Sequence, residues 1–124
     1  MDCKIELIFV PVTDVDRARD FYVDNVGFTL DYDVRVDESV RFVQITPVGS
    51  ACSIAFGEGL GDQMAPGTQK GIQVVVDDAE AARKDLLSRG VEASEVEVLA
   101  WGSFTRFTDP DGNAWTVQQL PNRD

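Results

Sequence analysis

"IELIFVPVTDVDRARDFYVDNVGF", residues 5–28, decides the fold, because its pattern returns later as "GIQVVVDDAEAARKDLLSRGVEA", residues 71–93. Each copy has an apolar run, then an aspartate, an amphipathic segment and a glycine. This order predicts a strand, a helix that begins after a capping aspartate, and a helix end at the glycine. The chain therefore contains an internal duplication of a strand–helix unit.

The matching positions hold the residue types that helix ends need. Asp14 and Asp78 can accept hydrogen bonds from free N–H groups in the first helical turn. Gly27 and Gly90 can adopt the left-handed conformation that ends a helix. Apolar residues recur at helical spacing in both copies, which predicts helices packed on a sheet. These residues are Val15, Ala18, Phe21 and Tyr22 in the first copy, and Ala79, Ala82, Leu86 and Leu87 in the second.

Further strands follow each predicted helix. "RFVQITP" (41–47) and "SACSIAFG" (50–57) flank a short turn in the first half, and "SFTRFT" (103–108) and "AWTVQQL" (114–120) flank "DPDGN" in the second. A proline presets one turn angle and a glycine accepts a positive φ, so "DPDGN" predicts a hairpin. Each half is therefore predicted to have the element order βαβββ.

The predicted fold class is α+β, with paired βαβββ modules that form an incomplete mixed-sheet barrel around a cleft. The length of 124 residues suits one domain. We expect a first module at 1–58, a glycine-rich linker loop at 59–70 and a second module at 71–124.

Composition excludes several classes of function. The formal net charge of −11 disfavours nucleic-acid and membrane partners, since both carry negative charge. The chain has no histidine, which removes Ser-His and Cys-His nucleophilic pairs. Cys3 and Cys52 lie far apart and are expected to be reduced thiols. The first residues lack the features of a signal peptide, and we expect a cytoplasmic protein.

The motifs "VTDVDRARDFYVDNVGF", "VVVDDAEAARKDLLSRGV" and "WGSFTRFTDPDGNAW", in this order, resemble the vicinal oxygen chelate superfamily. That superfamily includes glyoxalase I, extradiol dioxygenases, fosfomycin-resistance enzymes and bleomycin-resistance proteins. The resemblance implies the paired-module fold, a cavity enclosed by two modules, and a homodimer that in some members exchanges modules.

The resemblance also locates the places where relatives bind a metal. In this chain those places hold Leu7, Ala55, Gly71 and Thr116. A catalytic divalent metal generally needs three protein ligands, and these side chains do not supply them. We therefore expect no metal, no cofactor, and no glyoxalase or dioxygenase chemistry.

Alternation of side chains along the strands predicts which residues face the cleft. The expected wall has rings, amides and one cation, which suits an organic ligand. The candidate ligand-binding residues are Phe9, Phe42, Gln44, Gln73, Trp101, Phe104, Arg106, Thr116 and Gln118.

Each candidate also has a structural interpretation. Phe9 and Phe42 can fill a closed core, Gln44 and Gln73 can hydrogen-bond each other, and Arg106 can pair with a carboxylate. Trp115 alternates with the cleft-facing residues and is expected to pack under a helix.

Three functions fit the sequence. The favoured one is metal-free capture of an aromatic or cationic organic molecule, such as an antibiotic, by a homodimer. The alternative is a metal-independent isomerase or lyase, for which Glu6 and Glu58 are the acids nearest to strand ends. A regulatory or assembly module with a vestigial cavity is the third.

Overall fold

The computed structural model describes residues 1–61 and 64–121. Two βαβββ modules follow one another along the chain, so the predicted fold class is confirmed. The first module consists of β1 (Leu7–Phe9), α1 (Val15–Asp20), η1 (Phe21–Val26), β2 (Thr29–Asp37), β3 (Val40–Thr46) and β4 (Ser53–Glu58). The second consists of β5 (Ile72–Val76), α2 (Ala79–Ser88), β6 (Glu97–Leu99), β7 (Gly102–Thr108) and β8 (Ala114–Gln119).

Both helices begin and end as the sequence predicts. Asp14 accepts a hydrogen bond from the backbone N–H of Arg17, and Asp78 accepts one from Ala81, each at 3.0 Å. Gly27 and Gly90 have φ of 88° and 85°, in the left-handed region. The first helix departs from a regular α-helix, because η1 continues α1 as a π-helix.

The two modules repeat one sheet topology. The strand orders are β1-β4-β3-β2 and β5-β8-β7-β6. In each sheet the first and fourth strands are parallel and the other neighbours are antiparallel. The modules differ most in their second strand, which has nine residues in β2 and three in β6.

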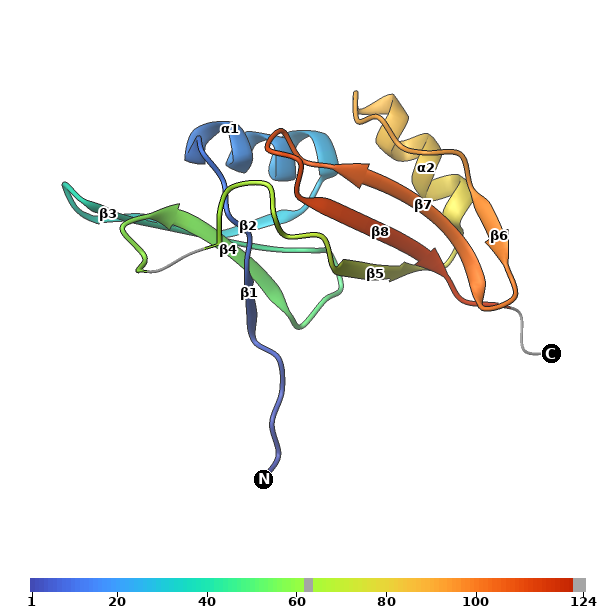
Figure 1. Cartoon of the computed structure of the whole chain (residues 1–124), viewed down its shortest axis with the longest axis horizontal. Helices are drawn as coiled ribbons and strands as arrows, with labels where there is room; N and C mark the ends of the chain where they lie inside the picture. Colours follow the sequence, from blue (N-terminus) through green and yellow to red (C-terminus); the bar gives the residue numbers. More distant parts are fainter. Residues whose placement is uncertain (62–63, 122–124) are drawn as a thin grey trace.

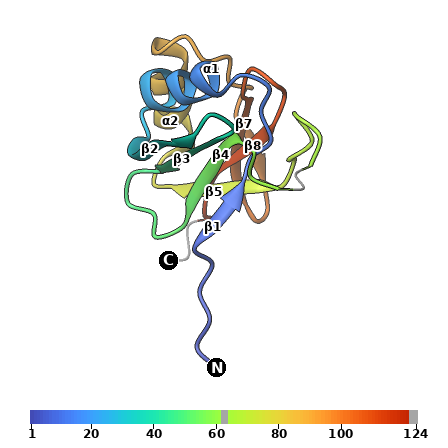
Figure 2. The same cartoon turned by 90° about the vertical axis from the view of Figure 1, so that its left-hand side faces the viewer.

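The helices cover one side of the sheets. Figures 1 and 2 show α1 and α2 on the same side of the molecule, while the N-terminal segment extends from the other. Burial along β3 follows this arrangement, because Val43 and Ile45 are fully buried whereas Phe42 and Gln44 are half-buried. One hydrophobic core spans both modules and includes Phe107 of β7 and Leu86 of α2. Leu87, expected in the same stripe as Leu86, is instead exposed, because it lies on the side of α2 that faces away from the core. None of the helices in the described ranges has the length and apolar character required to span a bilayer.

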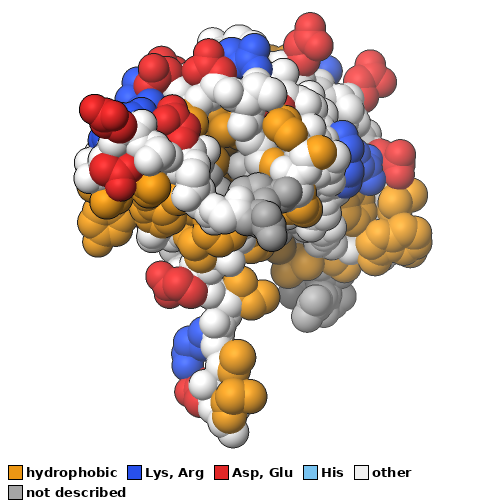
Figure 3. All heavy atoms as spheres, turned by 60° about the vertical axis from the view of Figure 1, so that its left-hand side comes forward, with side chains coloured by type: hydrophobic (Ala, Val, Ile, Leu, Met, Phe, Trp, Pro, Cys, Tyr) orange, Lys and Arg blue, Asp and Glu red, His pale blue; other side chains and the backbone are white. Residues whose placement is uncertain are grey.

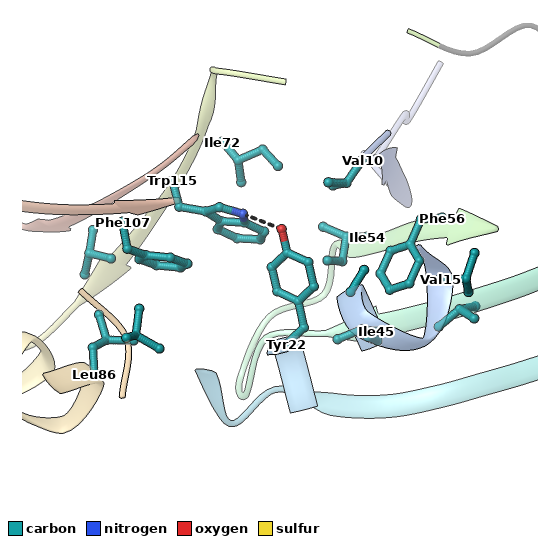
Figure 4. Packing of buried hydrophobic residues seen from close by; sticks show 14 residues of the cluster. Val10, Val15, Tyr22, Ile45, Ile54, Phe56, Ile72, Leu86, Phe107 and Trp115 are labelled. Atoms are coloured by element: carbon teal, nitrogen blue, oxygen red, sulfur yellow. Dashed lines mark hydrogen bonds between the residues drawn. The ribbon is translucent and has the colours of Figure 1, made fainter. Parts of the chain in front are cut away.

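Two aromatic residues join the modules. Tyr22 of η1 is fully buried, and its ring centroid lies 5.6 Å from that of Trp115 on β8. The indole Nε1 of Trp115 donates a 3.0 Å hydrogen bond to the Tyr22 hydroxyl, shown in Figure 4. That hydroxyl donates at 2.7 Å to Asp109. Burial, together with the nearby Asp109 carboxylate, raises the pKa of Tyr22 well above its ordinary value.

The turn between β7 and β8 also connects the two modules. The contacts of Tyr22, Trp115 and Asp109 and those of this turn are together called the joint. Asp109 accepts hydrogen bonds from the backbone and side-chain amides of Asn113, at 2.9 and 2.8 Å. Asn113 also donates to the carbonyl oxygen of Pro11 at 2.8 Å, and Thr13 donates to Asp111 at 2.7 Å. The predicted hairpin turn is confirmed, and it additionally fastens the second module to the first.

An ion-pair cluster links β2 to β3 and to α1. Arg41 of β3 donates to both carboxylate oxygens of Asp33, at 3.0 and 2.9 Å, and Arg19 of α1 donates to the same carboxylate at 2.8 Å. These hydrogen bonds, above all those from Arg41, lower the pKa of Asp33 to about 2. Asp33 therefore carries its charge throughout the neutral range.

Candidate functional site

The sheet faces that point away from the helices, called the open face below, carry the candidate residues in rows. On the second sheet, Gln73, Thr116 and Arg106 are register partners across β5, β8 and β7. Gln118 and Phe104 are partners in the next row. The predicted pairing across the β7–β8 hairpin is confirmed, and the register of that ladder runs without a shift.

The open face of the first sheet is richer in exposed rings. Phe9, Ala55 and Gln44 lie in one row across β1, β4 and β3, and Tyr32 of β2 continues it. Tyr32 is 57% exposed and Phe9 36%, while Phe42 in the adjacent row is half-buried. Phe9 and Phe42 thus lie outside the hydrophobic core that spans the modules.

A hollow of about 610 Å³ lies on the second module beside the β7–β8 turn. This size suits a small organic molecule. Two of the candidate residues, Arg106 and Thr116, line it. Its other polar lining residues are Lys70, Glu92, Ser94 and Thr108.

The segment between α2 and β6 forms one wall of this hollow. Ser94 donates from its backbone N–H to the carbonyl oxygen of Arg106 at 2.9 Å, and its hydroxyl accepts from the Arg106 N–H at 2.9 Å. Thr105 donates to the Ser94 carbonyl at 2.7 Å. These bonds hold the segment against the edge of β7, where β6 no longer pairs.

Arg106 covers the neighbouring candidate ring. Its guanidinium carbon lies 5.6 Å from the centroid of Phe104, a cation–π distance. Phe104 is only 4% exposed and does not belong to the hydrophobic core that spans the modules. The accessible group at this position is therefore the guanidinium, and the ring lies beneath it.

A chain of amides connects Gln73 to the Trp101 loop. Gln73 donates from Nε2 to Gln118 Oε1 at 2.6 Å, and Gln118 donates from Nε2 to the carbonyl oxygen of Trp101 at 2.9 Å. The Trp101 side chain itself is 63% exposed. The Gln118 amide therefore positions the loop that presents the Trp101 ring.

Gln44 belongs to a separate polar group on the first sheet. It donates to Ser53 Oγ at 3.3 Å, and that oxygen lies 2.6 Å from Thr46 Oγ1. Thr46 also donates to Asp31. The proposed direct bond between Gln44 and Gln73 is wrong, because each amide bonds within its own module.

The positions that hold metal ligands in relatives bring no ligand set together here. Leu7 pairs in register with Ser53, and Thr116 pairs with Gln73. Within residues 1–61 and 64–121, no group of three His, Cys, Asp or Glu side chains is arranged to hold a metal ion.

The acids considered for base catalysis lie away from the hollow. Glu58 pairs with Arg35 at 3.0 Å, and both side chains are about half exposed. Glu6 is exposed just before β1. Asp109 is a buried acid, 4% exposed, but its carboxylate accepts the hydrogen bond of Tyr22 between the modules. Neither candidate acid is buried at the site.

Sequence reasoning missed four polar residues of the hollow. The position of Thr108 could have been predicted from the alternation of side chains along β7, because Thr108 lies two residues beyond Arg106. Lys70 fell within the expected linker. Glu92 and Ser94 follow the glycine that ends α2, and their sequence has no pattern that predicts pairing with β7.

The chain matches the model of the family described as "Glyoxalase/Bleomycin resistance protein/Dioxygenase superfamily" over residues 4–117. Among curated proteins it is 22% identical over 117 residues to YetH of Bacillus subtilis (strain 168), an uncharacterized protein, with 94% of this chain and 98% of YetH covered.

Solved structures match over the same length. TnmS3, an antibiotic binding protein from Streptomyces sp. CB03234, is 33% identical with a TM-score of 0.86, covering 97% of this chain and 98% of TnmS3. A glyoxalase/bleomycin resistance protein from the same strain is 34% identical with a TM-score of 0.81, covering 94% of this chain and all of that protein. With its paired βαβββ modules and this match over nearly its whole length, the chain belongs to the glyoxalase/bleomycin resistance protein/dioxygenase superfamily.

Proposed function

We propose that this protein captures a small aromatic or cationic organic molecule, such as an antibiotic, without a metal ion. The observation that carries the proposal is the open face, which presents exposed rings and amides and, beside the β7–β8 turn, a hollow of about 610 Å³ lined by Arg106 and Thr116. An exposed hollow of this size supports binding over a vestigial, collapsed cavity. The similarity to TnmS3, described as an antibiotic binding protein, supports the same class of ligand.

The chemistry of the open face suits stacking more than catalysis. Trp101 and Tyr32 are the most exposed aromatic side chains, at 63% and 57%. A ring that stacks on one of them gains about 0.5–1.5 kcal/mol beyond the burial of its area. Gln73 has an amide oxygen that accepts no hydrogen bond within the described residues, so it can receive one from a ligand.

A second copy of the chain is the proposed partner. β2 is an edge strand whose nine residues are all exposed, including Leu30, Tyr32 and Val34. Figure 3 shows hydrophobic side chains gathered along the underside of the molecule, with most charged side chains above them. Exposed apolar patches on an edge strand mark an interaction surface. A homodimer that covers β2 would close the open face into a ligand-sized cleft.

Thermal unfolding with candidate drugs tests the capture of a ligand. A planar anthracycline, a cationic glycopeptide of the bleomycin class and a drug-free control form the panel. A ligand that binds only the folded protein raises the midpoint as its concentration increases. We expect such a rise with at least one drug, and a smaller rise for Trp101→Ala. Unchanged midpoints with every drug up to millimolar concentration would contradict the proposal.

A further inference from the structure

Arg106 differs from the other arginines of this protein. Residues 1–61 and 64–121 contain seven arginines, and six of them donate hydrogen bonds to oxygen atoms of the protein. The Arg106 guanidinium makes neither a hydrogen bond nor an ion pair in that part of the chain, and it lies over the Phe104 ring. The six bonded arginines are Arg17, Arg19, Arg35, Arg41, Arg83 and Arg89.

An unpaired arginine is unexpected in so acidic a chain. Asp and Glu number 22 against 11 Lys and Arg, so carboxylate acceptors are abundant. A guanidinium has five N–H donors in a planar fork that matches a carboxylate, sulfonate or phosphate. The Phe104 ring restricts where this fork can lie, because the cation is attracted to the ring face.

The surroundings of Arg106 add donors and positive charge. Lys70 lines the same hollow, and its Nζ donates one hydrogen bond, to Gly112 at 2.7 Å. Thr108 and Thr116 also line it, and their hydroxyls make no hydrogen bond within the described residues. Glu92 supplies one opposing carboxylate. Two cations against one anion give this hollow a positive balance in a chain whose net charge is −11.

We infer that the hollow is a subsite for an acidic group of the captured molecule, with Arg106 as its main donor and Lys70 as a supporting cation. The inference rests on the proposed function, and it narrows the ligand to an aromatic compound that carries a carboxylate, sulfonate, phenolate or phosphate. Arg106 and Lys70 contact the acidic group, and the aromatic part of the ligand extends from the hollow over the open face.

Two matched probes test this subsite. Naphthalene-2-carboxylate and naphthalene-2-carboxamide have the same ring and differ in charge. Titration calorimetry at low salt is carried out on the wild-type chain, Arg106→Gln, Arg106→Lys and Lys84→Gln. Lys84 is exposed on α2 and does not line the hollow, so its variant controls for the loss of one positive charge.

We expect the wild-type chain to bind the carboxylate at least about tenfold more tightly than the carboxamide, as charged hydrogen bonds would give. Arg106→Gln should lose this preference, Arg106→Lys should retain part of it, and Lys84→Gln should retain all of it. Equal affinity of the wild-type chain for the two probes would overturn the acidic subsite and leave capture of the ring intact. A preference that survives in Arg106→Gln would overturn the role of Arg106.

A second measurement separates the subsite from capture of the ring. Sulfate is titrated while the Nε–Hε resonance of Arg106, assigned with Arg106→Gln, is followed by NMR. A saturable shift that is weakened in Lys70→Gln supports the subsite even if neither naphthalene compound binds. No shift of that resonance would overturn it.

Discussion

The indole nitrogen of Trp115, on the last strand, donates a 3.0 Å hydrogen bond to the hydroxyl of Tyr22, which belongs to the first module. The same hydroxyl donates to Asp109 in the turn that precedes Trp115. One phenol therefore links two parts of the second module to the first, inside a core that excludes water.

Removal of this hydroxyl should destabilise the fold. Tyr22→Phe leaves the Trp115 N–H without its acceptor and takes one donor from Asp109, so we expect the free energy of unfolding to fall by about 1–3 kcal/mol. Urea unfolding at pH 7 measures it. The matched control is Tyr32→Phe at the exposed tyrosine, with an expected change below about 0.5 kcal/mol. Equal effects in the two variants would show that the buried bonds contribute nothing net.

Stability should also decrease in alkaline solution because of Tyr22. Its pKa is raised in the folded state, whereas in the unfolded chain a tyrosine ionises near pH ~10. Above that pH the folded protein therefore binds one more proton than the unfolded chain. The stabilisation that Tyr22 contributes is complete below about pH 10 and is lost as the pH rises further. Between pH 10 and 11.5 the wild-type chain should lose up to about 1.4 kcal/mol per pH unit more than Tyr22→Phe. If urea unfolding shows the same decrease in the free energy of unfolding for the wild-type chain and Tyr22→Phe over this pH range, the prediction is wrong.

Acid should weaken the cluster around Asp33. The folded-state pKa of about 2 lies below the unfolded value of about 3.9, so the stabilisation is present above about pH 4 and is lost as pH falls towards 2. At pH 7, Asp33→Asn should lower the free energy of unfolding by about 1–2 kcal/mol. The difference from the wild-type chain should become small near pH 2 and vanish below it.

An exposed ion pair provides the control for Asp33. Asp85 pairs with Arg89 at 3.1 Å on α2, with both side chains about half exposed. Asp85→Asn should change the free energy of unfolding at pH 7 by less than about 0.5 kcal/mol. A larger loss in Asp85→Asn than in Asp33→Asn would refute the importance of the two-oxygen pairing between Arg41 and Asp33.

Trp101 should report ligand binding by its fluorescence. Of the two tryptophans, Trp115 is 1% exposed in the core and Trp101 is 63% exposed at the open face. A bound aromatic drug should quench the emission of Trp101 more strongly than that of Trp115, which is buried even though it borders the hollow. The Trp101→Phe protein should therefore lose most of the quenching at the same drug concentration. Undiminished quenching in that variant would place the ligand elsewhere.

The proposed dimer can be tested on β2. Val34 is 47% exposed on an apolar edge strand, and Val34→Glu should convert the dimer to a monomer because a buried, unpaired carboxylate is costly. Light scattering at tens of micromolar protein measures the mass. Leu87→Glu, at a similarly exposed apolar residue on α2, should remain dimeric. A monomeric wild-type chain would exclude the dimer.

The local features of the fold could be predicted because they depend on neighbours in sequence. The capping of α1 by Asp14 follows from side-chain reach within one turn, and the rows through Thr116 and Gln118 follow from alternation and a short turn. Such relationships need no knowledge of the rest of the chain.

The features that could not be predicted depend on residues far apart. The bond between Asn113 and Pro11 joins residues 102 positions apart, and no periodicity encodes it. The placement of Glu92 in the hollow depends on an irregular segment that lies along β7. The position of the Arg106 guanidinium over the buried Phe104 ring depends on the conformation of a flexible side chain, which strand alternation does not predict.

The joint made by Tyr22, Trp115 and Asp109 lies in the core, whereas the candidate ligand contacts lie on the opposite sheet faces. The contact between the two halves is thus made by buried side chains and does not depend on the exposed residues proposed to bind the ligand. Duplicated copies of such a chain can therefore come to bind different molecules by substitution of exposed residues alone. The contacts among Tyr22, Trp115 and Asp109 that join the modules need not change.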